Sequence, residues 1–117
     1  MDYYPINLRD KLTEEGNLSL ELTRIYACQL FRGLNWIHRS QVVHRDINPS
    51  NILLEGDKLV ICDFGSAKKL NEDNACYVGC RSYRAPELIL RCSYGKEVDV
   101  WAAGCVLVEM ITGIPLF

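Results

Sequence analysis

The sequence has 117 residues, enough for one small domain but not for two. Hydrophobic residues make up 49% of it and charged residues 24%, a composition that supports a folded core and excludes an intrinsically disordered protein. With 13 basic and 15 acidic residues the net charge is −2. Because there is no basic stripe, we expect neither nucleic acid nor a membrane as a partner.

Six cysteines are scattered along the chain without a Cys-x-x-Cys pair. The first residues, Met1 to Pro5, lack the basic and then apolar order of a signal peptide. The longest apolar run, Val100 to Val108, is too short to span a membrane. We therefore interpret the cysteines as reduced thiols of a cytoplasmic or nuclear protein, not as a disulfide framework or a zinc site.

The first half of the chain predicts two helices. Residues Ile6 to Glu15 are expected to form a short helix ended by Gly16, with Pro5 in its first turn. A longer one-faced helix follows, with Ser19 as its N-cap, and runs to about Arg39. Its apolar residues recur at steps of three and four: Leu22, Ile25, Tyr26, Leu30, Leu34 and Ile37.

The second half predicts a hairpin, a loop and a further helix. Two short strands, 51–54 and 59–62, flank a turn, and residues 63–83 show no sustained period. We predict that these residues form a long loop, which in a compact domain is usually functional. Residues Glu97 to Thr112 form a helix that ends at Gly113 and Pro115. Because apolar residues cover nearly all its faces, it is expected to be buried on all sides.

An ordered series of short motifs lies within this framework. His44-Arg45-Asp46 is followed by Asn51, by Asp63-Phe64-Gly65, by Ala85-Pro86-Glu87 and by Asp99. In order and spacing they resemble the catalytic-loop, metal-binding and activation-segment motifs of eukaryotic protein kinases. The resemblance implies a mainly α fold: a partial protein-kinase C-lobe, spanning residues 1–117 as one partial domain, with a short β-hairpin at the catalytic site and no N-lobe.

The resemblance also implies a reaction. Phosphoryl transfer requires mainly that the reactants be positioned and their charge neutralised. The carboxylate of Asp46 would orient a substrate hydroxyl for in-line attack. Since Mg²⁺ prefers oxygen ligands and keeps several waters, the side chains of Asn51 and Asp63 suffice to hold it. ATP and Mg²⁺ are the implied cofactors. A protein Ser/Thr substrate is the implied partner, together with a missing N-lobe or a partner chain that supplies one.

The family's nucleotide contacts fall on four residues of this sequence. The backbone of Asp2 and Tyr4 would meet the adenine, and Leu53 and Cys62 complete the implied nucleotide site. The alternative to an enzyme is a non-catalytic, truncated protein that resembles a pseudokinase and binds a partner or nothing.

Finer resemblances point to one branch of the kinases. The run from Tyr77 to Arg84 is similar to the activation-segment end of the CMGC branch, which includes the cyclin-dependent, mitogen-activated and glycogen synthase kinases. In it, Tyr77 has the place of a phosphorylatable tyrosine and Arg81 that of a distinctive arginine. The run Cys62 to Lys68 looks most like the glycogen synthase kinase-3 group, whereas Pro49-Ser50-Asn51 leans to the mitogen-activated kinases.

In the glycogen synthase kinase-3 group, the positions of Arg45 and Lys68 help to bind a phosphate on a primed substrate. For Lys68, a solvated surface side chain is an equally open interpretation.

Five further side chains are expected to have structural roles. By resemblance, Asp99 is a buried helix carboxylate that accepts hydrogen bonds from the catalytic-loop backbone. His44 is expected to be a packed structural histidine, and His38 a satisfied side chain at a helix end. Phe64 and Trp101 are assigned to the core.

Two positions depart from the family pattern. Asn48 takes the place of a catalytic lysine that contacts the transferred phosphate, and Cys80 that of a threonine or serine that links this lysine to Asp46. An amide cannot supply the point charge of a lysine. The chain also has no Gly-x-Gly sequence for a phosphate-covering loop. We therefore expect the 117-residue chain alone to be inactive on a generic substrate. We also expect it to be poorly soluble, because the helix 97–112 is of the buried type but lacks its covering helices and so exposes apolar patches.

Overall fold

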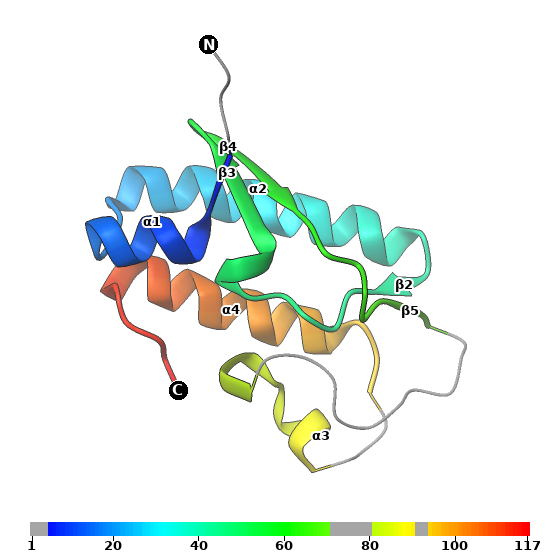
Figure 1. Cartoon of the computed structure of the whole chain (residues 1–117). Coiled ribbons are helices and arrows are strands. Elements are labelled where there is room, and N and C mark those ends of the chain that lie inside the picture. The colour runs from blue at the N-terminus through cyan, green and yellow to red at the C-terminus, as the bar shows by residue number, and fades with distance from the viewer. Residues whose placement is uncertain (1–4, 71–80, 91–93) are drawn as a thin grey trace.

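The computed structural model describes residues 5–70, 81–90 and 94–117, and these form a mainly α structure with small sheets (Figure 1). In chain order the elements are β1 (Ile6–Asn7), α1 (Leu8–Glu15), α2 (Leu20–Arg39), β2 (Val42–Val43), the 3₁₀ turn η1 (Pro49–Asn51), β3 (Ile52–Glu55), β4 (Lys58–Ile61), β5 (Lys68–Lys69), the 3₁₀ turn η2 (Arg81–Tyr83), α3 (Pro86–Ile89) and α4 (Glu97–Thr112). The mainly α fold with a hairpin at the catalytic loop is confirmed.

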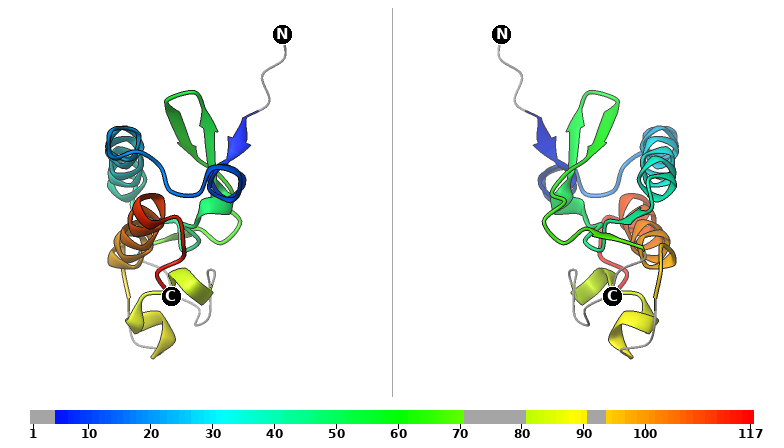
Figure 2. Two further views of the ribbon diagram at one scale, coloured as in Figure 1. Left: turned by 90° about the vertical axis from the view of Figure 1, so that its left-hand side faces the viewer. Right: turned by 90° about the vertical axis from the view of Figure 1, so that its right-hand side faces the viewer.

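Helices α2 and α4 pack against each other. Figure 2 shows the antiparallel sheet β1-β3-β4 and α1 on one side of this pair, with α3 below. The core lies between these layers, because α2 turns one apolar stripe toward the sheet and α4. Its members include Leu12, Tyr26, Leu30, Leu34, Ile52, Leu54, Ala103, Val106 and Met110.

The long helices begin and end where the sequence predicts. The hydroxyl of Ser19 accepts a hydrogen bond from the backbone N–H of Leu22 at 3.1 Å and so caps α2. Gly113 ends α4 in the left-handed region at φ 83°. A Cβ atom at Gly113 would lie 2.8 Å from the backbone N of Asn17, so this close approach also requires glycine.

The first predicted helix is wrong at its start. Ile6 and Asn7 form strand β1, in which Ile6 pairs with Leu54 of β3. The helix begins only at Leu8, because the side chain of Asn7 accepts a hydrogen bond from Asp10 N at 2.8 Å and caps it. Pro5 therefore precedes the helix instead of lying in its first turn.

The predicted loop 63–83 is wrong in part. Within it, Lys68–Lys69 pairs antiparallel with Val42–Val43, and η2 covers Arg81–Tyr83. The short helix α3, which follows it, was not predicted at all. Elements of two to four residues are too short to show a hydrophobic period, so pattern alone cannot find them.

Helix α4 has the predicted bounds but is not buried on all sides. Val98, Ala102 and Val106 are buried, whereas Val100 is 49% exposed and Trp101 40%. The assignment of Trp101 to the core is therefore wrong; its ring stacks on Phe117, with centroids 6.1 Å apart. Trp101 also lines an apolar groove of about 460 Å³ beside α3. In the part of the chain that is described, none of the helices combines the length and the apolar character needed to cross a bilayer.

Candidate functional site

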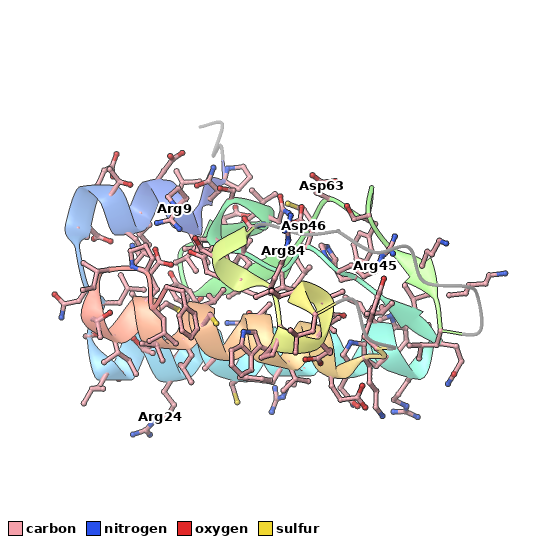
Figure 3. All side chains as sticks on the ribbon, turned by 90° about the horizontal axis from the view of Figure 1, so that it is seen from below. Arg9, Arg24, Arg45, Asp46, Asp63 and Arg84 are labelled. Atoms are coloured by element: carbon pink, nitrogen blue, oxygen red, sulfur yellow. The ribbon has the colours of Figure 1, made fainter. Side chains whose placement is uncertain are left out.

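The catalytic loop and the residues after β4 meet at the open end of the β3–β4 hairpin. Ile52 pairs with Ile61, and one step beyond them the backbone N–H of Cys62 donates to the carbonyl of Asn51 at 2.9 Å. This pairing brings Asn51 and the residue after Cys62, Asp63, to the same end of the hairpin. Figure 3 shows Asp46 and Asp63 on the same side of the molecule, whereas Arg24 projects from the opposite edge.

The carboxylate of Asp46 is held by two side-chain amides. The Nδ2 group of Asn48 donates to Oδ1 at 2.9 Å, and that of Asn51 donates to Oδ2 at 3.0 Å. The Nδ2 group of Asn51 also donates to the backbone oxygen of Asp46 at 2.8 Å. Asp46 is half-buried, so this carboxylate is fixed in orientation yet reachable from solvent.

The residues that the sequence predicts as magnesium ligands fit that role. Both described hydrogen bonds of the Asn51 side chain come from Nδ2, so neither of them uses the oxygen Oδ1. Asp63 is exposed, and of its two oxygens only Oδ1 accepts a described hydrogen bond, from Gly65 N at 3.2 Å. One amide oxygen and one carboxylate suit a hard cation that keeps its waters. No group of three or more His, Cys, Asp or Glu side chains gathers as a metal site among the described residues.

The catalytic loop is anchored by Asp99, in the first turn of α4. Its side chain is buried; Oδ2 accepts from the backbone N–H of His44 at 2.8 Å and Oδ1 from that of Arg45 at 2.9 Å. The Nε2 atom of His38 makes a third hydrogen bond, 2.8 Å from Oδ2. The expected roles of Asp99 and His38 are thus confirmed. Arg45 has a φ of 72°, a strained conformation that this anchor stabilises.

His44 is a packed structural histidine, as expected. It is completely buried, its Nδ1 accepts from Asp46 N at 3.1 Å, and its Nε2 lies 2.9 Å from the carbonyl oxygen of Cys62. These bonds require the neutral tautomer with the proton on Nε2. Phe64 packs edge-on against the ring at a centroid distance of 4.8 Å. Phe64 is itself 49% exposed, so its assignment to the core is wrong.

Of the predicted regulatory residues, the structure describes Arg45 and Lys68. The pairing of β2 with β5 sets Lys68 opposite Val43, close in the chain to Arg45. Arg45 is buried, donating through Nε to Ser66 O at 2.5 Å and through Nη1 to the Tyr94 hydroxyl at 2.9 Å. Four residues singled out in the sequence lie outside the described residues: Asp2, Tyr4, Tyr77 and Cys80. The side chain of Arg81 also lies outside them.

The two described residues predicted to contact a nucleotide lie on or next to the sheet. Leu53 pairs with Val60 on the face opposite Ile52 and Leu54, which point into the core. Cys62 directly follows β4 and is partly buried. Burial, with the nearby carboxylate of Asp63 adding to it, raises the pKa of the Cys62 thiol. Cys62 is a free thiol, as are Cys28 and Cys105.

Sequence reasoning missed a buried charged cluster. Glu109 of α4 is completely buried and accepts hydrogen bonds from Arg9 of α1 and from the hydroxyl of Tyr83. Arg9 also donates to that hydroxyl at 2.6 Å. Burial, together with the bond and charge of Glu109, raises the pKa of Tyr83 well above its usual range, so the hydroxyl remains a donor. A signal for it in the sequence is a single glutamate within the apolar stretch of α4 that follows Asp99.

Comparison with known proteins places this geometry in a family. The protein kinase domain matches residues 1–117. Cyclin-dependent kinase-like 5 of Mus musculus is 43% identical over 122 residues, covering 99% of this chain and 13% of that protein. Mitogen-activated protein kinase mpkC of Aspergillus terreus is 46% identical over 109 residues, and protein kinase MCK1 of Saccharomyces cerevisiae 43% over 117. These alignments cover 92% and 96% of this chain but only 30% and 31% of those relatives.

Proposed function

Because this chain belongs to the protein kinase family, we propose that the protein carrying it transfers the γ-phosphoryl group of ATP to serine or threonine hydroxyls of other proteins. The observation that carries this proposal is the arrangement around Asp46. Two amides fix its carboxylate, and the oxygen ligands Asn51 and Asp63 lie at the same end of the hairpin.

In this proposal the chain's own residues position the reactants. A substrate hydroxyl donates a hydrogen bond to the Asp46 carboxylate, which orients its oxygen for in-line attack and accepts its proton. Asn51 and Asp63 would hold Mg²⁺, which neutralises charge on the phosphates when bound. The bonds from Asp99 to the loop backbone keep Asp46 in place before the substrate arrives, so little reorganisation is needed.

We also place the adenine against the outer face of the sheet. Leu53 and Val60 are cross-strand partners on that face, and Val60 is 57% exposed. An apolar patch of this kind suits a flat heterocyclic ring. Replacing Leu53 with Asp should raise the Kd for ATP at least tenfold, and Val60→Thr should have a smaller effect. Unchanged ATP binding in Leu53→Asp would contradict the placement.

Within the family we propose the glycogen synthase kinase-3 group. The support is the run Cys62 to Lys68 and the pairing that sets Lys68 opposite Val43, two residues before Arg45. A phosphate on a primed substrate would bind basic side chains of this kind. The test compares the rates of phosphorylation of a peptide already phosphorylated beside its acceptor residue and of the unmodified peptide. The unaltered protein should prefer the phosphorylated peptide, and Lys68→Ala should remove this preference. Equal rates on both peptides in the unaltered protein would contradict the assignment.

The activity itself is tested with the protein expressed with every residue that its gene encodes. Incorporation of labelled γ-phosphate into a serine/threonine peptide library should require Mg²⁺ and fall at least 100-fold in Asp46→Asn and in Asp63→Asn. Asp57→Asn, which changes an exposed carboxylate on the hairpin turn, is the matched control and should leave the rate unchanged. Turnover that survives Asp63→Asn would contradict the proposal.

One observation favours a second candidate. Asn48 stands where the family has a cation, and its amide is bonded to Asp46 instead of facing a phosphate as a charge. A non-catalytic protein that binds Mg²⁺ and ATP would retain a ligand-dependent rise in melting temperature without turnover. That pair of results would replace the enzyme by this candidate.

A further inference from the structure

The side chain of Asn48, which takes the place of the family's lysine, makes several hydrogen bonds within the catalytic loop. Besides the 2.9 Å bond to Oδ1 of Asp46, its Nδ2 group approaches the backbone oxygen of Asp46 at 3.2 Å. Its own Oδ1 accepts from the backbone N–H of Ser50 at 2.9 Å and caps η1. The residue is 7% exposed. Both ends of this amide are therefore engaged inside the catalytic loop.

We propose that Asn48 is a positioning residue which, together with Asn51, forms a two-amide clamp on the catalytic carboxylate. The inference rests on the proposed phosphoryl transfer and deepens it. Each oxygen of Asp46 accepts from a different amide, Oδ1 from Asn48 and Oδ2 from Asn51. One bond would leave the carboxylate free to rotate about its Cβ–Cγ bond, whereas two bonds from opposite sides fix its plane.

The clamp is itself rigidly mounted. The cap on Ser50 N fixes the side chain of Asn48, and Pro49, which has no N–H, occupies the first position of η1. Asn51 ends the same turn and is followed directly by β3. The carbonyl of Asn51 accepts a hydrogen bond from the backbone N–H of Cys62. A short amide with two side-chain torsions loses less freedom in this setting than a lysine with four. Bonds to an ionised acceptor are also among the stronger hydrogen bonds in proteins.

The replacement of the family's lysine by Asn48 has two separate effects, one on charge and one on hydrogen bonding. The positive charge beside the transferred phosphate is absent, but the catalytic carboxylate keeps a donor at that position. A role limited to capping η1 would involve only Oδ1 of Asn48, whereas the clamp depends on Nδ2. The two roles can therefore be distinguished by a side chain that retains the acceptor and lacks the reach of the amide.

Asn48→Ser is that variant, because serine is a good N-cap but ends one atom short. In the full protein with Mg²⁺ and ATP, the clamp predicts that Asn48→Ser and Asn48→Ala both lower kcat about tenfold or more, with the KM for ATP within about twofold of the unaltered value. A kcat for Asn48→Ser equal to that of the unaltered protein would leave only the capping role and overturn the proposal.

A second measurement does not depend on turnover. In protein labelled with ¹⁵N-asparagine, Asp46→Ala should shift the side-chain amide signals of Asn48 and Asn51 by several line widths. The amide of Asn7, whose oxygen caps α1 by accepting from Asp10 N, is the internal control and should not move. If the unaltered protein shows no turnover and the shifts are present, the proposed function fails and the clamp stands. If the Asn48 signal does not move, the clamp is overturned whatever the activity.

Discussion

The two buried carboxylates of α4 are held in different ways. Asp99, in the first turn, accepts two hydrogen bonds from the backbone of one loop and a third from His38. Glu109, near the last turn, accepts from the side chains of Arg9 and Tyr83, which belong to two other elements. Both carboxylates are almost completely buried, at 1% and 0% exposure.

The difference follows from their positions on the helix. At the N-terminal end, the helix dipole favours a negative charge, and Asp99 accepts hydrogen bonds from two backbone N–H groups and from His38. At the C-terminal end the dipole opposes a negative charge, and Glu109 is stabilised by the guanidinium of Arg9. The first carboxylate therefore fixes the geometry of the catalytic loop, and the second joins α1, η2 and α4 into one body. Three substitutions test this comparison, and a fourth tests the exposed face of the same helix.

The largest loss of stability is expected for Asp99→Asn. An amide NH₂ must then face a backbone donor, so one buried N–H is left without an acceptor, and the free energy of unfolding should fall by about 3 kcal/mol. Urea unfolding measures it. The control is Glu97→Gln, an exposed acid in the same helical turn, which should change stability by less than about 0.5 kcal/mol. A loss for Asp99→Asn no greater than for its control would break the comparison.

Glu109→Gln should cost less, about 2 kcal/mol of unfolding free energy. The amide oxygen can still accept one bond, and the side chain of Arg9 is 35% exposed and can be hydrated once its partner is neutral. The matched control is Glu15→Gln, which breaks the surface pair with Lys11 and should cost at most about 0.5 kcal/mol. If Glu109→Gln abolished activity more strongly than Asp99→Asn, the assigned roles would be reversed.

Tyr83→Phe should cost about 1 kcal/mol at neutral pH, since Glu109 keeps its bond to Arg9. The raised pKa of Tyr83 makes this contribution depend on pH. It is fully present below the ordinary tyrosine value of about 10 and is lost as the pH rises above it. The unfolding free energies of the two proteins should therefore differ by a constant amount up to about pH 10 and converge only as the pH rises from there toward the raised pKa of the folded protein. Cys62 and Cys105, whose pKa values are also raised, are common to both proteins and cancel.

The smallest effect on stability is expected at the outer face of α4. Trp101 is 40% exposed and contacts Phe117 by stacking, so Trp101→Lys should change the unfolding free energy by less than about 1 kcal/mol. The same change should raise the solubility limit, because it interrupts an exposed apolar patch. A loss of several kcal/mol would show that Trp101 acts as a core residue.

Long elements and local motifs could be predicted from the sequence. Helices α2 and α4 show strong apolar patterns and clear end signals at Ser19 and Gly113, and their bounds are confirmed. The loop anchor Asp99 could be predicted from the family resemblance, because motifs preserve the order of residues along the chain.

What could not be predicted depends on long-range contacts. Arg9 and Glu109 lie far apart in the sequence, and neither belongs to a motif. Phe64 and Trp101 were assigned to the core because they are apolar, but a large side chain is buried only where other elements cover it. Strand β5 exists because β2 pairs with it, not because of its own two lysines.

The central claim, that Asp99 holds the catalytic loop in place, is tested most directly by hydrogen exchange at the backbone amides of His44 and Arg45. These two amides donate to Asp99 and lie outside any regular helix or sheet pairing. We predict that both exchange as slowly as the amides of α2 in the unaltered protein and at least 100-fold faster in Asp99→Asn. Rapid exchange of both amides in the unaltered protein, or protection that persists in Asp99→Asn, would contradict this claim.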